Sequence, residues 1–247
     1  MIIRPNKAAA VELYRKLGAS IEAEQRTGIH VSDLLQPRKA YWAKTMPLPP
    51  TEAEIGYWLA GKAHHFFLVQ ALTGVSDTQE ASLVDLATGV HYSPDLVALK
   101  GEFKTTRWGM LPTTLQAVTR ATEGYIAQCR AYAALMRTCE WNLYVFYLMA
   151  LDLKIDSKPP RLKVYTLLFE EEDLALERNT LAYKKHKLEA ALDIHDPLEL
   201  PLCSEFMCYR MVGHGRGRKK TIEGVCKWWN VCKPEGRYID NEQEKIV

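Results

Sequence analysis

The chain has 247 residues and a mass of 28.2 kDa; 47% of the residues are hydrophobic and 25% are charged. These proportions are ordinary for a globular protein with one domain or two small ones. Thirty-two basic and thirty acidic residues leave a formal charge of +2. That balance excludes a histone-like polycation and an acidic tail protein, but a local basic stripe can still exist within it.

Hydropathy and cysteine usage indicate the compartment. The longest apolar run, from Leu143 to Leu151, is well short of the roughly 20 residues that span a bilayer. The first residues contain no apolar core of signal-peptide length. Six cysteines are too few for a secreted disulfide scaffold of this size. We therefore expect a soluble, cytoplasmic protein with no membrane partner.

The first third of the chain favours helices. Residues 8–26 are rich in Ala, Glu, Leu and Arg, and this helix is expected to end near Gly28. Ser32 is a candidate N-cap for a second helix that contains Pro37 in its first turns. Thr51 and Glu54 form a Thr-x-x-Glu capping box, so a third helix is expected from there to about Gly74.

The next segments predict strands and helices in a mixed order. Residues 80–107 contain short β-branched segments separated by glycine turns, which is typical of a meander of strands. A helical period follows over 113–137, then strands over 142–151 and 161–169, then a charged helix over 171–193. The expected fold is α/β: a mixed β-sheet flanked by helices, followed by a cysteine-rich C-terminal tail.

The chemistry-bearing residues lie around the meander. Side chains alternate along a strand, so Glu102 and Lys104 should share one face while Phe103 points into the opposite, buried one. A four-residue loop from Ala98 to Gly101 would pair Asp95 with Lys104 and place it diagonally from Glu102. Two carboxylates at that spacing can bind a hard divalent cation, and the lysine can orient water. The alternative is a surface hairpin with solvated charges, which short motifs often prove to be.

Further motifs stand on either side of these residues. Gly61 is followed four residues later by His65, Pro94 precedes Asp95, and Gln128 and Tyr132 stand four apart on one helix face. The order Gly-x-x-x-His, Pro-Asp, Glu-x-Lys, Gln-x-x-x-Tyr resembles the PD-(D/E)XK nucleases of the RecB-like exonuclease group, which includes CRISPR-associated RecB-like exonucleases and related phage nucleases. The resemblance covers residues 30–132.

The resemblance implies a restriction-endonuclease-like core and a role for each matched residue. Asp95, Glu102, the Phe103 carbonyl and His65 would ligate Mg²⁺ or Mn²⁺. Lys104 would position the attacking water. Gln128 and Tyr132 would brace the site and touch DNA near the scissile phosphate. The competing interpretation makes His65 and Tyr132 core residues and Gln128 an exposed one; His64, at the wrong spacing, is expected to be structural.

The cysteines gather at the C-terminal end. Four of them are spaced Cys203-x₄-Cys208-x₁₇-Cys226-x₅-Cys232. In members of the resembling group, one N-terminal and three C-terminal cysteines hold an iron–sulfur cluster, but Gln36 stands at the N-terminal position here. A 4Fe–4S cluster rebuilt with Cys203, a Zn²⁺ site and free thiols all remain open. Cys129 and Cys139 are expected to lie in the core.

A glycine-punctuated basic run lies between these cysteines, from Arg210 to Lys220. Its charge predicts contact with a phosphate backbone. For the nearby Trp228 and Trp229, core packing is favoured over base stacking.

Three hypotheses on function follow. The first is a single nuclease domain over 1–247, with a helical part (1–79), a nuclease core (80–170) and a C-terminal helix and tail (171–247). It would be a divalent-metal-dependent deoxyribonuclease, an exonuclease rather than an endonuclease, acting on single-stranded DNA or duplex ends. Recombination, repair or CRISPR-adaptation proteins would be its partners. The second is a non-catalytic nucleic-acid-binding module with a relic nuclease face. The third treats the match as accidental and predicts that His65, Asp95 and Glu102 do not converge.

Overall fold

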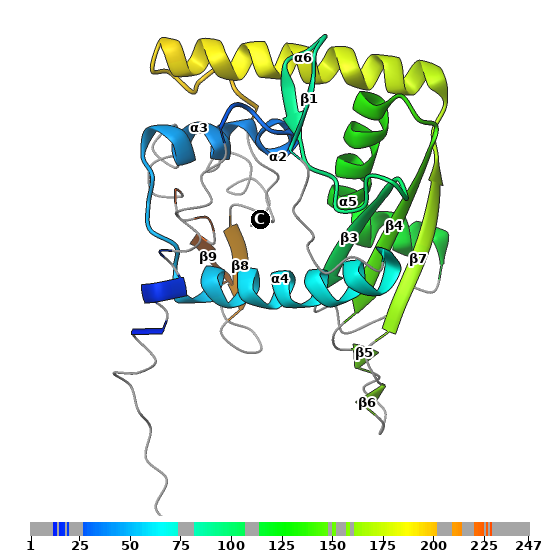
Figure 1. The fold of residues 1–247 in the computed structure, drawn as a ribbon. Coiled ribbons are helices and arrows are strands. Elements are labelled where there is room, and N and C mark those ends of the chain that lie inside the picture. The colour runs from blue at the N-terminus through cyan, green and yellow to red at the C-terminus, as the bar shows by residue number, and fades with distance from the viewer. Residues whose placement is uncertain are drawn as a thin grey trace, which may run out of the picture. The chain divides into compact units, whose positions relative to one another are not determined.

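The fold is known from a computed structural model, which describes residues 27–73, 82–106, 114–147, 161–201, 209–213 and 220–224, with short pieces at 12–13, 15–17, 19, 150–151, 157–158, 226 and 228. The helices and strands are labelled in Figure 1, and the chain divides into two compact units. Unit 1 comprises residues 1–35 and 49–185, and unit 2 comprises 36–48 and 186–247. Whether 1–247 folds as one domain stays a prediction. The predicted helix over 8–26 falls largely outside the described residues.

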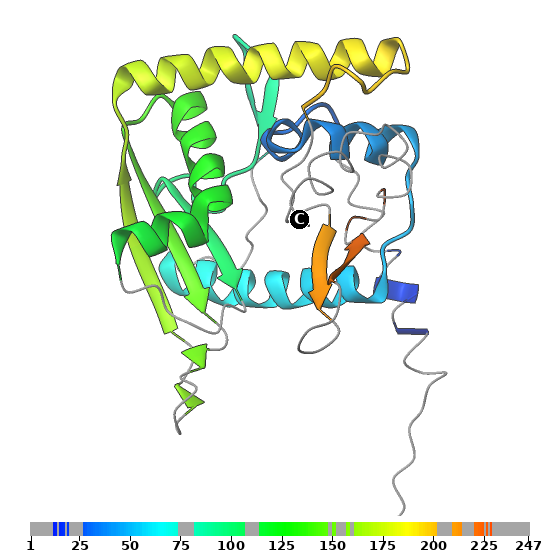
Figure 2. The same cartoon turned by 180° about the vertical axis from the view of Figure 1, so that it is seen from behind.

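A three-stranded mixed sheet forms the centre of unit 1. Its order is β3 (Gly101–Thr106), β4 (Glu140–Tyr147) and β7 (Arg161–Leu168); β3 and β4 are parallel, and β4 and β7 are antiparallel. The parallel pair is joined through helix α5 (Leu115–Met136), which contacts both strands. Figure 2 shows α5 lying over one face of this sheet. The predicted mixed sheet flanked by helices is confirmed.

The alternation of side chains along β4 explains which face α5 covers. Trp141, Leu143, Val145 and Tyr147 are fully buried, and the ring of Tyr132 on α5 lies 6.0 Å from that of Trp141. The strand register places Glu102 beside Leu143 and Lys104 beside Val145. Both charged residues of β3 therefore lie on the face that α5 covers, as their spacing predicts.

Phe103 points to the other face of the sheet. Its ring stacks on that of Tyr144 at 6.3 Å, and the residue is buried, as predicted. On the same face, the ring of His64 lies 5.3 Å from Phe146, while its Nδ1 lies 2.6 Å from the Ala60 carbonyl. His64 is therefore a packing residue, which confirms the structural role expected from its spacing.

Helix α4 (Glu52–Thr73) begins at the predicted capping box. The Thr51 amide donates to Glu54 Oε2 at 2.8 Å, and the Glu54 amide donates to Thr51 Oγ1 at 3.2 Å. The reciprocal pair provides acceptors for two amides that a helix N-terminus leaves without partners. Helix α4 contacts β3, and so brings its residues to the strand that carries Glu102.

The meander prediction is wrong in part. Strands β1 (Leu83–Asp85) and β2 (Val90–Tyr92) pair as an antiparallel hairpin, but β3 joins a different sheet. A single bridge between Leu96 and Gly101 connects the two segments, with both backbone hydrogen bonds formed at 3.0 and 3.1 Å. The intervening loop has four residues, as expected, but it runs from Val97 to Lys100. Asp95 therefore stands opposite Glu102, and the predicted pairing with Lys104 is wrong.

The second predicted helix is two helices. Helix α2 (Val31–Leu35) ends before Gln36, and α3 (Pro37–Thr45) begins at the proline. A residue before proline is disfavoured in the helical region, and proline itself is tolerated in a first turn, which explains the break. Ser32 lies inside α2 and is not its cap; instead the His30 amide donates to Asp33 Oδ2 at 3.0 Å.

Helix α6 (Glu171–Asp193) spans the predicted range and contributes to both units. In unit 1 it makes polar contacts with α5. Arg178 donates twice to the Ala134 carbonyl, at 2.8 and 3.1 Å, and Arg130 lies 2.9 Å from Glu177. These contacts fix α5 in its position over the sheet. None of the helices that the structure describes is long and apolar enough to cross a membrane.

Unit 2 contains α3, the end of α6, and a hairpin of β8 (Tyr209–Gly213) and β9 (Lys220–Gly224). Arg38 is 1% exposed and donates to the carbonyls of Leu198 and Leu200 at 2.7 to 3.2 Å. Trp228 is buried, and its Nε1 donates to the Met46 carbonyl at 3.0 Å. The core role predicted for Trp228 is confirmed; Trp229 lies outside the described residues.

We expect Arg38→Met to destabilise unit 2 by about 2–4 kcal/mol, because buried carbonyls would lose charged donors without gaining replacements. Urea unfolding followed by tryptophan fluorescence measures the difference. Lys39→Met is the matched control, since it removes the same charge from the exposed neighbouring position. Equal unfolding midpoints for the two variants would contradict this role for Arg38.

Candidate active site

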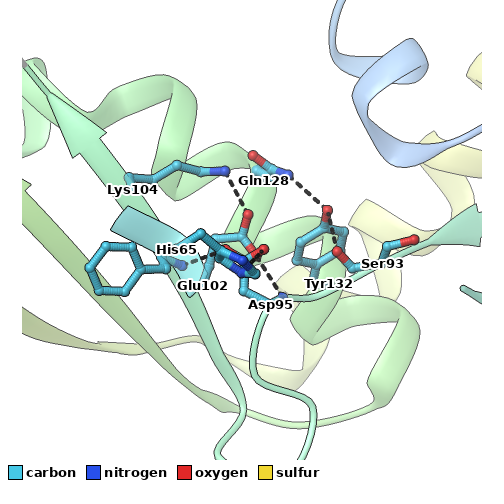
Figure 3. Close-up of polar contacts among 8 residues, drawn as sticks. His65, Ser93, Asp95, Glu102, Lys104, Gln128 and Tyr132 are labelled. Carbon is cyan, nitrogen blue, oxygen red and sulfur yellow. Dashed lines mark hydrogen bonds and ion pairs between the residues drawn. The ribbon is translucent and has the colours of Figure 1, made fainter. Parts of the chain in front are cut away.

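The predicted site residues of unit 1 lie together (Figure 3). His65 comes from α4, Asp95 from the loop after β2, and Glu102 and Lys104 from β3. His65 Nε2 lies 3.1 Å from Asp95 Oδ1, and Lys104 Nζ lies 2.6 Å from Glu102 Oε1. The third hypothesis, that the match is accidental, predicts that His65, Asp95 and Glu102 do not converge. Their proximity contradicts it. The role of each residue stays a prediction.

Asp95 connects the members of the cluster. Its Oδ2 accepts a hydrogen bond from the Phe103 amide at 2.7 Å, and its own amide lies 3.4 Å from Glu102 Oε2. The Leu96–Gly101 bridge is isolated, and no regular strand pairing continues from it to Asp95 and Glu102. The Asp95 carboxylate, instead of a backbone carbonyl, accepts from the Phe103 amide. This contact fixes Asp95 against β3, which explains why one short loop brings the two acids together.

Burial sets the electrostatics of the two acids. Glu102 is 1% exposed, and burial, with the added charge of Asp95, raises its pKa to about 7 although Lys104 opposes the shift. Burial also disfavours the Asp95 carboxylate. The close contact with His65, the Lys104 charge and the Phe103 amide outweigh it and hold the pKa of Asp95 below its usual value. One acid is thus held ionised, and the other titrates near neutrality.

Lys104 keeps its proton. Burial disfavours the ammonium group, but the carboxylates of Glu102 and Asp95 outweigh that effect and raise the pKa of Lys104 above its usual value. Its Nζ also lies 6.0 Å from the centroid of the Tyr125 ring. Lys104 can therefore donate hydrogen bonds and neutralise negative charge, whereas in this arrangement it cannot accept a proton.

Gln128 and Tyr132 lie beside the cluster on α5. Gln128 Nε2 donates to the Tyr132 hydroxyl at 2.7 Å, and that hydroxyl donates to the Ser93 carbonyl at 3.4 Å. Burial, reinforced by the charge of Glu102, raises the pKa of Tyr132, so the hydroxyl stays protonated. The pair holds the backbone two residues before Asp95. Whether either side chain touches a substrate stays a prediction.

Three neighbours of the site were not predicted from the sequence. They are the Ser93 carbonyl, the Tyr125 ring and the Cys129 thiol. Tyr125 precedes Gln128 by three residues and Tyr132 by seven. The helical period would have been sufficient to place it on the same face as these two residues. Cys129 is buried, as predicted, and burial with the charge of Glu102 raises the pKa of its thiol. Cys139, also predicted in the core, is exposed, because it lies after the end of α5.

The fit of a divalent cation depends on chemistry and on arrangement. Two carboxylates and an imidazole from three elements suit Mg²⁺ or Mn²⁺ by donor type. As arranged, their atoms are engaged with one another and with Lys104, and no three His, Cys, Asp or Glu side chains are placed to hold an ion anywhere in the part of the chain that the structure describes. The donor set fits, and its atoms must reorient to bind an ion.

Of the four cysteines in the tail, the structure describes one. Cys226 is a half-buried free thiol, whereas Cys203, Cys208 and Cys232 lie outside the described residues. The ends of the basic run lie in β8 and β9, and its centre over 214–219 is also outside them. The iron–sulfur, zinc and phosphate-contact predictions for this tail therefore stay predictions.

The unusual ionisation of Glu102 has a measurable consequence. Its folded pKa of about 7 exceeds the unfolded value near 4.3, so its stabilising contribution is complete below the unfolded pKa and is lost as pH rises through about 7. Without divalent ions, the free energy of unfolding should fall by about 3 kcal/mol from this group between pH 4.5 and 8. Asp95 acts in the opposite direction, below that window.

Urea unfolding across this pH range, with chelator present, measures the slope. Glu102→Gln cannot titrate, so its stability should vary much less with pH than that of the wild type. The same slope in both proteins would show that Glu102 is ionised normally.

Comparison with known proteins gives a distant structural similarity. No protein-family model matches the chain, and no curated protein matches it. Among solved structures, a phage-related exonuclease from Haemophilus somnus 129PT is similar, with 12% identity and a TM-score of 0.43. The match covers 66% of this chain and 82% of that one. Likeness at this level carries no argument about function.

Proposed function

We propose that the protein is a divalent-metal-dependent deoxyribonuclease, an exonuclease that hydrolyses phosphodiester bonds in single-stranded DNA or at duplex ends. The observation that carries the proposal is the cluster of His65, Asp95, Glu102 and Lys104, brought together from three elements at contacts of 2.6 to 3.4 Å. The buried Glu102 and the half-buried Asp95 beside one retained ammonium suit a reaction in which negative charge develops on a phosphate.

The metal would be held by Asp95 and Glu102, with His65 and the Phe103 carbonyl completing the protein ligands. A bound Mg²⁺ or Mn²⁺ supplies Lewis acidity toward the phosphate and lowers the pKa of a bound water. His65 lies on the Asp95 carboxylate at 3.1 Å, and a nitrogen ligand favours Mn²⁺ over Mg²⁺. Loading requires Glu102 to give up its proton, so metal affinity should rise with pH up to about 7.

The chain's own groups position the reaction. The raised pKa of Lys104 keeps it an ammonium, so it donates to the attacking water or to a phosphate oxygen and neutralises charge. The Phe103 amide fixes Asp95 from one side, and Tyr132 holds the Ser93 carbonyl on the other. Two elements, β3 and α5, thus hold the backbone segment that carries Asp95, which lowers the cost of organising the site.

A binding module with a relic nuclease face is the second candidate. Its support is the ion pair of Lys104 with the buried Glu102, because such a pair can also be purely structural. Against it stands the complete set of Asp95, Glu102 and Lys104, of which a relic is expected to lose at least one member. The two candidates differ in whether bound DNA is cleaved.

End-labelled single-stranded and duplex DNA, incubated with the protein and Mn²⁺, Mg²⁺ or chelator, tests the proposal. We expect nucleotide release with a divalent ion and none with chelator. Mononucleotides appearing from the start indicate exonuclease action, and internal fragments indicate endonuclease action. Tight DNA binding without cleavage under any metal condition supports the binding module instead.

A further inference from the structure

Helix α4, which carries His65, presents a stripe of aromatic and basic side chains beside it. Trp58, Lys62, His65 and Phe66 recur at i, i+4, i+7 and i+8, the spacing of a single helix face. Trp58 stands two helical turns from His65, about 10 Å along the axis. His65 contacts Asp95 at 3.1 Å, so the stripe leads along α4 from the candidate active site.

Aromatic rings and a cation follow one another along the stripe. Lys62 Nζ lies 6.0 Å from the Trp58 ring centroid, and Lys62 stands one turn before Phe66. Phe66 is 43% exposed, and Trp58 and Lys62 are half-buried. Aromatic rings on which bases stack, interspersed with cations near the backbone, are what proteins use to hold single strands without sequence preference.

The charge of α4 suits an anionic ligand. After Glu54 the helix contains no acidic residue as far as Thr73, and its ionisable groups there, besides Tyr57, are Lys62, His64 and His65. Helix α6 shows the opposite composition, with acidic and basic residues distributed along its length. If the stripe docked another protein through apolar contacts, the lysine at its centre would have no role. A phosphate backbone as ligand explains the lysine, because it would pair with the positive charge.

We propose that the stripe of Trp58, Lys62 and Phe66 binds an unpaired DNA strand, stacking its bases on the two rings and pairing a phosphate with the lysine. The inference rests on the proposed function, since the stripe would guide the strand to His65 and Asp95. It names the form of substrate: unpaired nucleotides are held, and a blunt duplex is not unless its end frays.

Fluorescence anisotropy of labelled oligo-dT, with the full chain in chelator so that nothing is cleaved, measures binding alone. Trp58→Ala and Phe66→Ala should each weaken binding by about 5- to 100-fold, the range expected for loss of one stacked base. Trp58→Phe should retain most of the affinity. Lys62→Ala should reduce the slope of log affinity against log salt by about 0.7.

Tyr57→Ala is the matched control. Tyr57 is 59% exposed on the same helix, and as the neighbour of Trp58 it is turned about 100° from it. We expect its oligo-dT affinity to stay within twofold of wild type. Thermal melts of all variants separate loss of binding from loss of folding, because Trp58→Phe and Lys62→Ala keep the helix intact.

Cleavage assays keep the inference distinct from the proposed function. If wild type degrades DNA but Trp58→Ala and Phe66→Ala bind and cleave single strands as well as Tyr57→Ala does, the stripe is not the strand site and the nuclease proposal stands. If oligo-dT binds through the stripe and no metal supports cleavage, the stripe is a strand-binding site and the nuclease proposal is wrong. Tighter binding of oligo-U than of oligo-dT would overturn DNA as the ligand.

Discussion

Lys104→Ala is expected to lower the rate of Mn²⁺-dependent DNA hydrolysis by about 10³-fold, the usual effect of losing a group that positions a nucleophile and stabilises developing charge. The structure gives the reason: the ammonium lies 2.6 Å from Glu102, and the neighbouring carboxylates keep it protonated. Single-turnover release of label from single-stranded DNA, at saturating protein, measures the rate without a contribution from substrate affinity.

Lys163→Ala is the control for this loss of charge, because Lys163 is exposed on β7 of the same unit. It should cleave at the wild-type rate. Lys104→Ala also leaves Glu102 buried without its ion-pair partner, so its folding must be checked by circular dichroism. A well-folded Lys104→Ala protein with wild-type activity would contradict the role assigned to the lysine.

Asp95→Asn is expected to weaken Mn²⁺ binding by about 100-fold and to lower DNA hydrolysis by at least as much. The substitution keeps the size of the side chain but removes the charge that contacts His65 and lies beside Glu102. A hard cation depends on carboxylate charge for its affinity. Titration of Mn²⁺ followed by electron paramagnetic resonance measures free ion directly and needs no DNA.

Asp85→Asn is the matched substitution elsewhere in unit 1. Asp85 is also buried, and its Oδ2 accepts from the Thr88 amide and hydroxyl at 2.9 and 2.7 Å. This is a turn contact with no link to the candidate site. We expect a small loss of stability and no change in Mn²⁺ affinity. Equal effects of the two substitutions on metal binding would show that Asp95 is not a ligand.

Much of the site follows from local sequence rules. The capping box at Thr51 sets the start of the helix that carries His65. Alternation along β3 places Glu102 and Lys104 on one face. The four-residue spacing of Gln128 and Tyr132 brings them into contact. Each of these depends on neighbours within a few residues, for which the periods of helix and strand are sufficient.

The remaining parts depend on distant partners. Strand β3 pairs with β4, which follows it in the sequence only after helix α5. Nothing in the sequence near Gly101 distinguishes this pairing from the pairing of neighbouring strands in a meander. The loop before β3 has the expected length but begins one residue earlier, at Val97, and the Asp95 carboxylate accepts from the Phe103 amide beside it. Strand register is decided by packing and turn geometry together.

The most direct test compares Mn²⁺-dependent hydrolysis of end-labelled single-stranded DNA by the wild type, Asp95→Ala and Lys104→Ala under identical conditions. The proposed function predicts label release by the wild type, abolished by chelator, and rates lower by about 10³-fold or more in both variants. Equal rates in all three proteins would contradict hydrolysis at this site.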